Sequence, residues 1–139
     1  WSSDVCSSDL TEVIDEACRS LDALIFDVKC LDSERHKKFT GVGNELILKN
    51  INHVFEHFPD LPVLIRTPVI PGFNDTEEDI LRIREMIPKK PNIRYEALTY
   101  HRLGQPKYGY LGRRYELEGV KADDAFMKRL NAMLKAYES

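Results

Sequence analysis

Four polar side chains of this 139-residue sequence stand at the ends of apolar segments, where they could bind one ligand together. They are Asp27 and Lys29 at the end of residues 23–28, Arg66 within residues 62–70, and His101 just after residues 92–98. A carboxylate can hold an ammonium group, a cation can hold a carboxylate, and short polar groups can hold ribose hydroxyls. The set therefore fits a zwitterionic ligand that carries a sugar.

Each of these residues also has a structural interpretation. Asp27 and Lys29 fit a solvated strand end or a structural ion pair. Arg66 fits a bridge to a helix carboxylate, and a lone His101 fits a structural hydrogen bond. Ligand binding is favoured by the position that they share, because functional groups of parallel barrels collect at the carboxyl ends of the strands.

Apolar periodicity predicts the elements that would position these residues. Three short apolar segments are expected as strands: 23–28, 62–70 and 92–98. Four segments with apolar residues at helical spacing are expected as helices: 11–21, 44–58, 75–87 and 123–137. This alternation implies an α/β fold with three parallel strand–helix units joined by crossovers. Because three strands leave two sheet edges unpaired, half of a barrel is expected.

The alternation of a strand also predicts which way the side chains of residues 23–28 point. Asp27 and Lys29 lie two residues apart, so they are expected to share a face with Ile25. The opposite face is expected to carry Phe26, Val28 and Cys30.

Local signals place the helix ends and the helix faces. Asn44 is the expected N-cap of the second helix, and Asp75 with Glu78 is the expected capping box of the third. Thr40-Gly41, Pro71-Gly72 and Asn74-Asp75 are interpreted as turns and caps. The expected inward stripe of the last helix is Phe126, Leu130, Met133 and Tyr137. Three histidines are expected on helix surfaces: His36, His53 and His57.

Charge and hydropathy exclude several classes of protein. The formal net charge of −3 gives no global attraction to nucleic acid or to an anionic membrane. No apolar run approaches the roughly 20 residues of a membrane span. The chain is long enough for one core but short for a complete α/β barrel. A soluble, cytoplasmic protein is expected.

The cysteines and the first ten residues carry no fold signal. The wide, equal spacing of Cys6, Cys18 and Cys30 matches neither a disulfide framework nor a metal-binding motif. Residues 1–10, WSSDVCSSDL, lack periodicity and are interpreted as a non-native leader, with a Ser-rich disordered terminus as the alternative. Residues 11–139 are then the part that forms the barrel domain.

Three blocks of this sequence resemble one enzyme family. They are DVKCLDSERHKKFTGVGNELILKNI, IRTPVIPGFND and YEALTYHRLGQPKYGYLGRRYEL. In this order and spacing they are similar to the second half of glycyl-radical-enzyme activating enzymes, which include the activating enzyme of pyruvate formate-lyase. The resemblance covers residues 21–120, and the three blocks together are far more specific than any one of them.

The resemblance implies a fold and a reaction. The fold is a partial (β/α)6 TIM-like barrel, of which the last three strands would lie here. The family binds S-adenosylmethionine on a 4Fe-4S cluster held by a CxxxCxxC motif, and flavodoxin or ferredoxin donates the electron. The 5′-deoxyadenosyl radical then takes a hydrogen atom from a glycine of a partner glycyl-radical enzyme. These radical SAM enzymes are oxidoreductases.

The resemblance also assigns residues to the cofactor site. Asp27, Val28 and Lys29 match the family's Asp-Leu/Val-Lys segment, which contacts the bound cofactor. Arg66 matches a strand arginine near the cofactor. The remaining matches are Leu98, against adenine, and His101, at the nucleoside.

The sequence departs from the family pattern in two ways. LTYH replaces the usual LPYH, so Thr99 loosens the loop and frees a backbone N–H near His101. These 139 residues also contain no CxxxCxxC and no glycine-rich segment for the cofactor's amino group. By themselves they are expected to be inactive and to bind S-adenosylmethionine very weakly.

Two other functions remain open at this point. Lys29 at a strand end fits Schiff-base chemistry in a different barrel enzyme, such as an aldolase. Residues 94–115 interleave tyrosines with basic residues, as in a groove that stacks single-stranded nucleic acid. The acidic overall balance and the lack of an RNA-binding signature argue against the second function.

Overall fold

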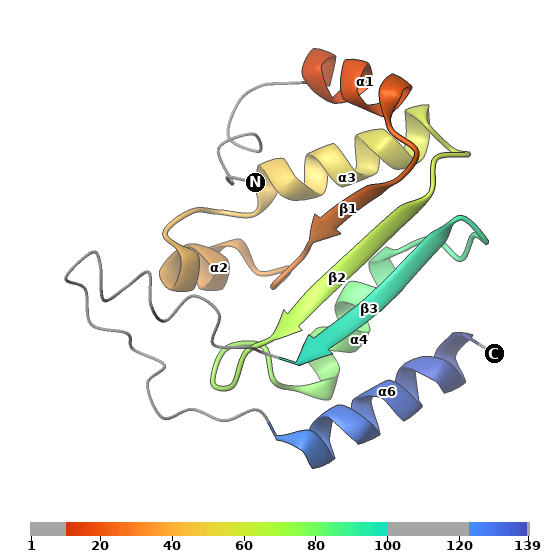
Figure 1. Cartoon of the computed structure of the whole chain (residues 1–139). Coiled ribbons are helices and arrows are strands. Elements are labelled where there is room, and N and C mark those ends of the chain that lie inside the picture. The colour runs from red at the N-terminus through yellow and green to blue at the C-terminus, as the bar shows by residue number, and fades with distance from the viewer. Residues whose placement is uncertain (1–10, 100–122, 139) are drawn as a thin grey trace, which may run out of the picture.

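A parallel sheet with helices packed on one face forms the described part of the chain (Figure 1). The structure is a computed structural model, and it describes residues 11–99 and 123–138. The elements are α1 (Thr11–Ser20), β1 (Leu24–Asp27), α2 (Ser33–Thr40), α3 (Glu45–His57), β2 (Val63–Val69), α4 (Glu77–Met86), β3 (Ile93–Thr99) and α6 (Asp124–Glu138). The predicted leader, residues 1–10, lies outside the described residues.

The three strands confirm the predicted parallel arrangement. The sheet order is β1-β2-β3, and both pairs are parallel. In the register Asp27 lies beside Arg66, and Arg66 lies beside Glu96. Residues 63–69 form a strand because the run is rich in β-branched residues that pack well on a pleated surface.

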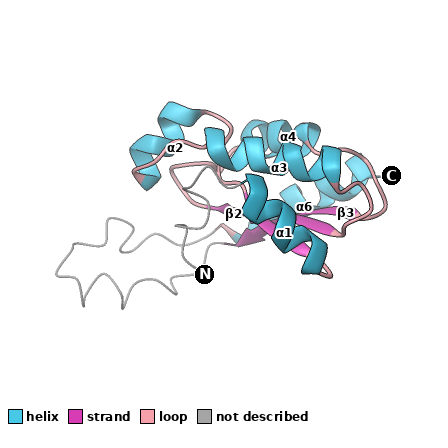
Figure 2. Ribbon diagram, turned by 90° about the horizontal axis from the view of Figure 1, so that it is seen from above, coloured by secondary structure: helices cyan, strands magenta, loops and turns pink. Residues whose placement is uncertain are grey.

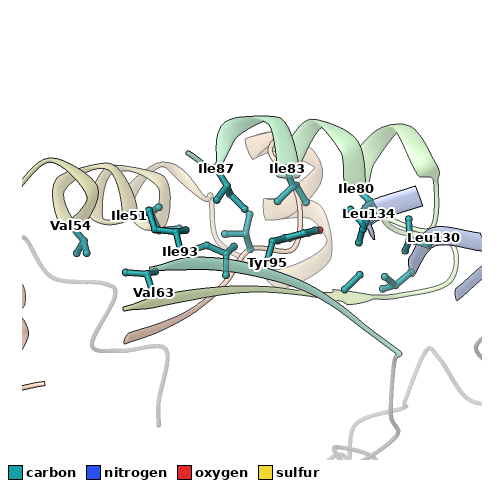
Figure 3. Close-up of a cluster of buried hydrophobic side chains, with 14 of the residues drawn as sticks. Ile51, Val54, Val63, Ile80, Ile83, Ile87, Ile93, Tyr95, Leu130 and Leu134 are labelled. Atoms are coloured by element: carbon teal, nitrogen blue, oxygen red, sulfur yellow. The ribbon is translucent and has the colours of Figure 1, made fainter. Parts of the chain in front are cut away.

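The two faces of the sheet have different environments. On β2 the buried residues alternate with half-buried ones, so Ile65 and Thr67 face inward. Figure 3 shows the apolar side chains of this face packed against α3 and α4, where each fully buried isoleucine contributes about 1.5–3 kcal/mol. Figure 2 shows α2, α3 and α4 above the sheet. Among the described residues no helix covers the opposite face, on which Ile25 is 52% exposed.

One helix, α2, was not predicted from the sequence. Its residues are SERHKKFT, which give little apolar periodicity. The side chain of Asp32 caps its start by accepting the N–H of Arg35, and Gly41 ends it with φ 89°. A left-handed residue at this position favours glycine, so local capping defines this helix more than burial does.

The predicted cap of α4 was wrong by one residue. Thr76, not Asp75, is the N-cap, and its hydroxyl accepts the N–H of Asp79 at 3.2 Å. The same hydroxyl donates to the Asp79 carboxylate at 2.7 Å. The side chain three residues later is therefore part of the cap, and Glu78 remains exposed.

The predicted inward stripe of α6 was correct at Leu130 and in part at Phe126 and Met133, which pack against the core while partly exposed. The buried residues are Met127, Leu130 and Leu134. Phe126 and Met133 are partly buried at the margin of the core. Tyr137 instead lies at the helix end, where its ring contacts two cations of the α4 region: Arg84 at 5.3 Å and Lys89 at 4.4 Å. The stripe is shifted because α6 packs against β3, which turns a neighbouring helical face inward.

The histidines also differ from expectation. His36 is buried, with 3% exposure, and its Nδ1 lies 2.7 Å from the Val42 carbonyl, so it is not a surface residue. His53 is half-buried and its Nε2 lies 2.6 Å from Asp15, which joins α3 to α1. His57 is exposed as predicted. No helix within residues 11–99 and 123–138 combines the length and apolarity that crossing a bilayer requires.

Candidate functional site

A polar contact on the uncovered face of the sheet joins Asp27 to Arg66. Arg66 Nε donates to Asp27 Oδ1 at 3.0 Å, and Arg66 Nη2 lies 2.9 Å from the same oxygen. The two residues are register neighbours, one at the end of β1 and the other in the middle of β2. Strand pairing alone therefore brings a carboxylate and a guanidinium together at this edge.

The exposure of this pair argues against a mainly structural role. The side chains of Arg66 and Asp27 are 35% and 41% exposed. Ion pairs this open to water contribute about 0–1 kcal/mol to stability. Arg66 also pairs with a neighbouring strand and not with a helix carboxylate, which was the structural alternative. Both charged groups remain accessible to a ligand from the open side.

The other predicted site residues differ in their burial and in the side of the sheet on which they lie. Leu98 is half-buried on β3 and shares the open face, because it alternates with the buried residues of that strand. Lys29 is half-buried just beyond β1. Val28 is 2% exposed and points into the core, so its side chain is not available to a ligand, and its backbone N–H already donates to the Arg66 carbonyl at 2.8 Å. His101 lies outside the described residues.

Two further charged residues face the same side and were missed by the sequence analysis. Glu96 is the register neighbour of Arg66, and Arg94 that of Leu64. Both are exposed while Tyr95 between them is buried. The alternation Arg-Tyr-Glu-Ala-Leu was the signal that could have identified them. With these residues, the open face carries charges on all three strands.

The loops at the carboxyl end of the sheet are fixed by α2. Arg35 Nη1 and Nη2 each lie 2.9 Å from one oxygen of Asp79, and Nη2 also donates to the Phe73 carbonyl. The hydrogen bond that Arg35 donates to the Asp79 carboxylate raises the pKa of Arg35 above its usual value. The rings of Phe39 and Phe73 stack at 4.1 Å. The β2–α4 loop is therefore held in place beside the candidate site.

Three buried polar side chains lie behind the site: Asn44, Thr67 and Asn74. From the sequence, Asn44 was assigned as a helix cap and Asn74 as a turn residue, and neither was expected to contact the segment after β1. Asn44 does precede α3, but its side chain makes no capping hydrogen bond. A single sequence gives no signal for such contacts, because their partners are distant in the chain.

Comparison with known proteins decides the family. No family model matches the chain. The chain is 84% identical over 135 residues to the (2S)-3-sulfopropanediol sulfolyase activating enzyme of Bilophila wadsworthia, which covers 97% of this chain and 45% of that relative. It is 45% identical over 111 residues to the isethionate sulfite-lyase activating enzyme of Oleidesulfovibrio alaskensis, covering 80% and 36%. The chain is homologous to the C-terminal part of the glycyl-radical-enzyme activating enzymes.

A solved structure of the same family supports the fold. A domain of pyruvate formate-lyase-activating enzyme from Bacteroides vulgatus superimposes with a TM-score of 0.68 and 29% identity, over 91% of this chain and 69% of that one. The predicted family and the predicted parallel α/β fold are thus confirmed. The chain spans about 45% of the activating enzyme to which it is 84% identical, and it matches the C-terminal part of the family.

Activating enzymes imply two cofactors, S-adenosylmethionine and an iron–sulfur cluster. The side chains on the open face fit the first of them. A carboxylate, a guanidinium and an apolar side chain on one face suit the ammonium, carboxylate and adenine of S-adenosylmethionine. An iron–sulfur cluster does not fit the described residues. They contain no group of three potential metal ligands, and burial raises the pKa of both described cysteines, Cys18 and Cys30. The described residues therefore fit part of a site for S-adenosylmethionine and offer no ligand set for a cluster.

Proposed function

We propose that the full-length protein is a radical S-adenosylmethionine enzyme that generates a glycyl radical on a partner enzyme. The observation that carries the proposal is the Asp27–Arg66 pair on the open face of the sheet, in a chain 84% identical to an activating enzyme. The pair is accessible and charged, and Asp27 lies at the carboxyl end of its strand, where barrel enzymes bind their ligands.

Each site residue would have a distinct role toward the cofactor. Asp27 would accept the ammonium group or a hydroxyl, because its carboxylate has only acceptor oxygens. Arg66 and Lys29 would hold the carboxylate, and Leu98 would pack against adenine. Val28 would contribute through its backbone, and His101 would contact the nucleoside. S-adenosylmethionine, when bound, would supply the radical chemistry.

The proposed partner is a glycyl-radical enzyme that acts on (2S)-3-sulfopropanediol. The identity to the activating enzyme of that sulfolyase is 84%, against 45% for an isethionate sulfite-lyase activating enzyme. A difference of this size favours conservation of the partner. Flavodoxin or ferredoxin would donate the electron, in a reducing cytoplasm.

These 139 residues by themselves would not catalyse the formation of the glycyl radical. The CxxxCxxC ligands of the cluster are not among them, and the described residues supply one wall of the cofactor pocket. Binding of S-adenosylmethionine to this chain alone would be very weak. An isothermal titration that gives micromolar affinity would contradict this part of the proposal.

The proposal is tested with the full-length protein under anaerobic conditions. The protein is reconstituted with iron and sulfide, reduced, and mixed with S-adenosylmethionine and the sulfolyase. We expect stoichiometric 5′-deoxyadenosine by chromatography and a glycyl-radical signal by electron paramagnetic resonance. Isethionate sulfite-lyase is the matched control partner and should give a weaker signal. A reduced, cluster-loaded protein that forms no 5′-deoxyadenosine would refute the proposed reaction.

A further inference from the structure

Three consecutive carbonyl groups after β1 are each bonded to a buried polar side chain. Thr67 Oγ1 donates to the Val28 carbonyl, Asn74 Nδ2 to the Lys29 carbonyl and Asn44 Nδ2 to the Cys30 carbonyl, all at 2.7 Å. The donors come from β2, from the β2–α4 loop and from the residue before α3. We call these three side chains the carbonyl clamp.

The three side chains of the carbonyl clamp are buried, so each would lower the stability of the fold if it made no hydrogen bond. Thr67 and Asn74 are 0% exposed and Asn44 is 3% exposed. A buried amide or hydroxyl without a partner costs about 1–3 kcal/mol, so such groups persist where their hydrogen bonds are made. Asn44 gives the clearest sign, because its side chain bonds to Cys30 and leaves the start of α3 without a side-chain cap.

The hydrogen bonds around Asn74 allow only one orientation of its side-chain amide. Both hydrogens of its amide nitrogen are used, one on the Lys29 carbonyl and the other on the Pro68 carbonyl at 2.9 Å. Its oxygen accepts the N–H of Ile70 at 2.6 Å. The amide therefore joins the end of β1, the end of β2 and the following loop, and reversing it would oppose like groups at all three bonds.

The carbonyl clamp acts where the regular sheet ends. The last backbone bond of the β1–β2 ladder runs from the Val28 N–H to the Arg66 carbonyl at 2.8 Å. Beyond it, the carbonyls of Val28, Lys29 and Cys30 accept hydrogen bonds from side chains instead of from the backbone of a neighbouring strand. Val28 and Cys30 are both buried at 2% exposure, whereas Lys29 between them is half-buried.

We propose that Thr67, Asn74 and Asn44 are positioning residues that fix the direction of the Lys29 side chain toward the ligand. The inference rests on the proposed function, in which Lys29 contacts S-adenosylmethionine. The clamp holds the Lys29 backbone before the ligand arrives, so little conformational freedom is lost on binding. None of the three side chains has to touch the ligand for this effect.

The test compares isosteric and conservative variants of the full-length protein. Thr67→Val removes one hydroxyl at nearly constant shape, and Thr67→Ser keeps it. Asn44→Asp removes the donor with the same size. The matched control is Ile83→Val in the core on α4, which lowers stability without touching the clamp. Affinity for S-adenosylmethionine is measured by titration, and hydrogen exchange is followed for the peptide that contains residues 28–31.

We expect Thr67→Val and Asn44→Asp to weaken S-adenosylmethionine binding about tenfold, as losses of supporting hydrogen bonds behind a ligand do. Both variants should exchange faster at residues 28–31, whereas Thr67→Ser and Ile83→Val should resemble the wild type. Equal loss of affinity in Ile83→Val would reduce the effect to general stability and overturn the inference. Wild-type affinity in Thr67→Val and Asn44→Asp would overturn it as well.

One further outcome separates this inference from the proposed function. If the wild-type protein binds no S-adenosylmethionine, the proposed function fails. Hydrogen exchange then tests, without any ligand, whether the clamp holds residues 28–31. If residues 28–31 exchange faster in Thr67→Val but not in Ile83→Val, the clamp still positions Lys29, for a ligand other than S-adenosylmethionine. If their exchange is unchanged in Thr67→Val, the inference is refuted.

Discussion

Arg66 directs two of its nitrogens, Nε at 3.0 Å and Nη2 at 2.9 Å, to a single oxygen of Asp27. The second carboxylate oxygen, Oδ2, takes part in neither contact. The carboxylate is thus oriented by its strand neighbour while one oxygen remains directed elsewhere. An oriented but accessible carboxylate at the carboxyl end of a parallel sheet suits ligand binding better than it suits stabilisation.

The Asp27→Asn variant separates these two roles. It removes the charge at constant shape, so we expect S-adenosylmethionine affinity of the full-length protein to fall about tenfold, by roughly 1.4 kcal/mol. The melting temperature should change little, because exposed pairs contribute about 0–1 kcal/mol. Glu77→Gln is the matched control, since Glu77 lies 4.0 Å from Arg129 in another exposed pair. Unchanged affinity in Asp27→Asn would remove Asp27 from the site.

The Arg35–Asp79 pair should matter for stability. Asp79 is 15% exposed and receives two bonds from Arg35 at 2.9 Å each. Because hydrogen bonds to charged groups contribute about 1.5–3 kcal/mol, Asp79→Asn should lower the free energy of unfolding by that amount. Urea denaturation measures the change. Glu78→Gln, one residue earlier and exposed, serves as the control and should unfold at the wild-type midpoint.

Tyr95 should make stability fall at alkaline pH. Burial raises its pKa from 10.0 to about 12. The unfolded chain releases this proton near pH 10 and the folded chain near pH 12, so folding loses about 1.4 kcal/mol per pH unit between them. Tyr95→Phe should remove this slope. Parallel stability curves of variant and wild type from pH 9 to 12 would disprove the expectation.

The cysteine that follows the candidate site should be unreactive. Cys30 is 2% exposed, and burial raises its pKa, which lowers the thiolate fraction at neutral pH. Iodoacetamide at pH 8 should label Cys30 only after denaturation, as measured by peptide mass spectrometry. Rapid labelling of the folded protein would mean that the segment after β1 opens readily.

The strands could be predicted because their signal is local and strong. The run from Val63 to Val69 is rich in β-branched residues and follows Pro62, so its assignment as a strand was correct. Helix α2 could not be predicted in the same way, because SERHKKFT has too few apolar residues for periodicity. Its position depends on the Arg35–Asp79 pair, which joins residues 44 apart in the chain.

The sequence by itself determined the three parallel strand–helix units, the family, and the side of β1 on which Asp27 lies. Strand periodicity and motif order carry that information within a few residues. Only the tertiary structure decided that Arg66 pairs with Asp27, and that Asn44, Thr67 and Asn74 hold the carbonyls around Lys29. Those contacts join residues 14 to 45 positions apart. Their specificity comes from burial, which forces each polar group to find a partner that local sequence does not encode.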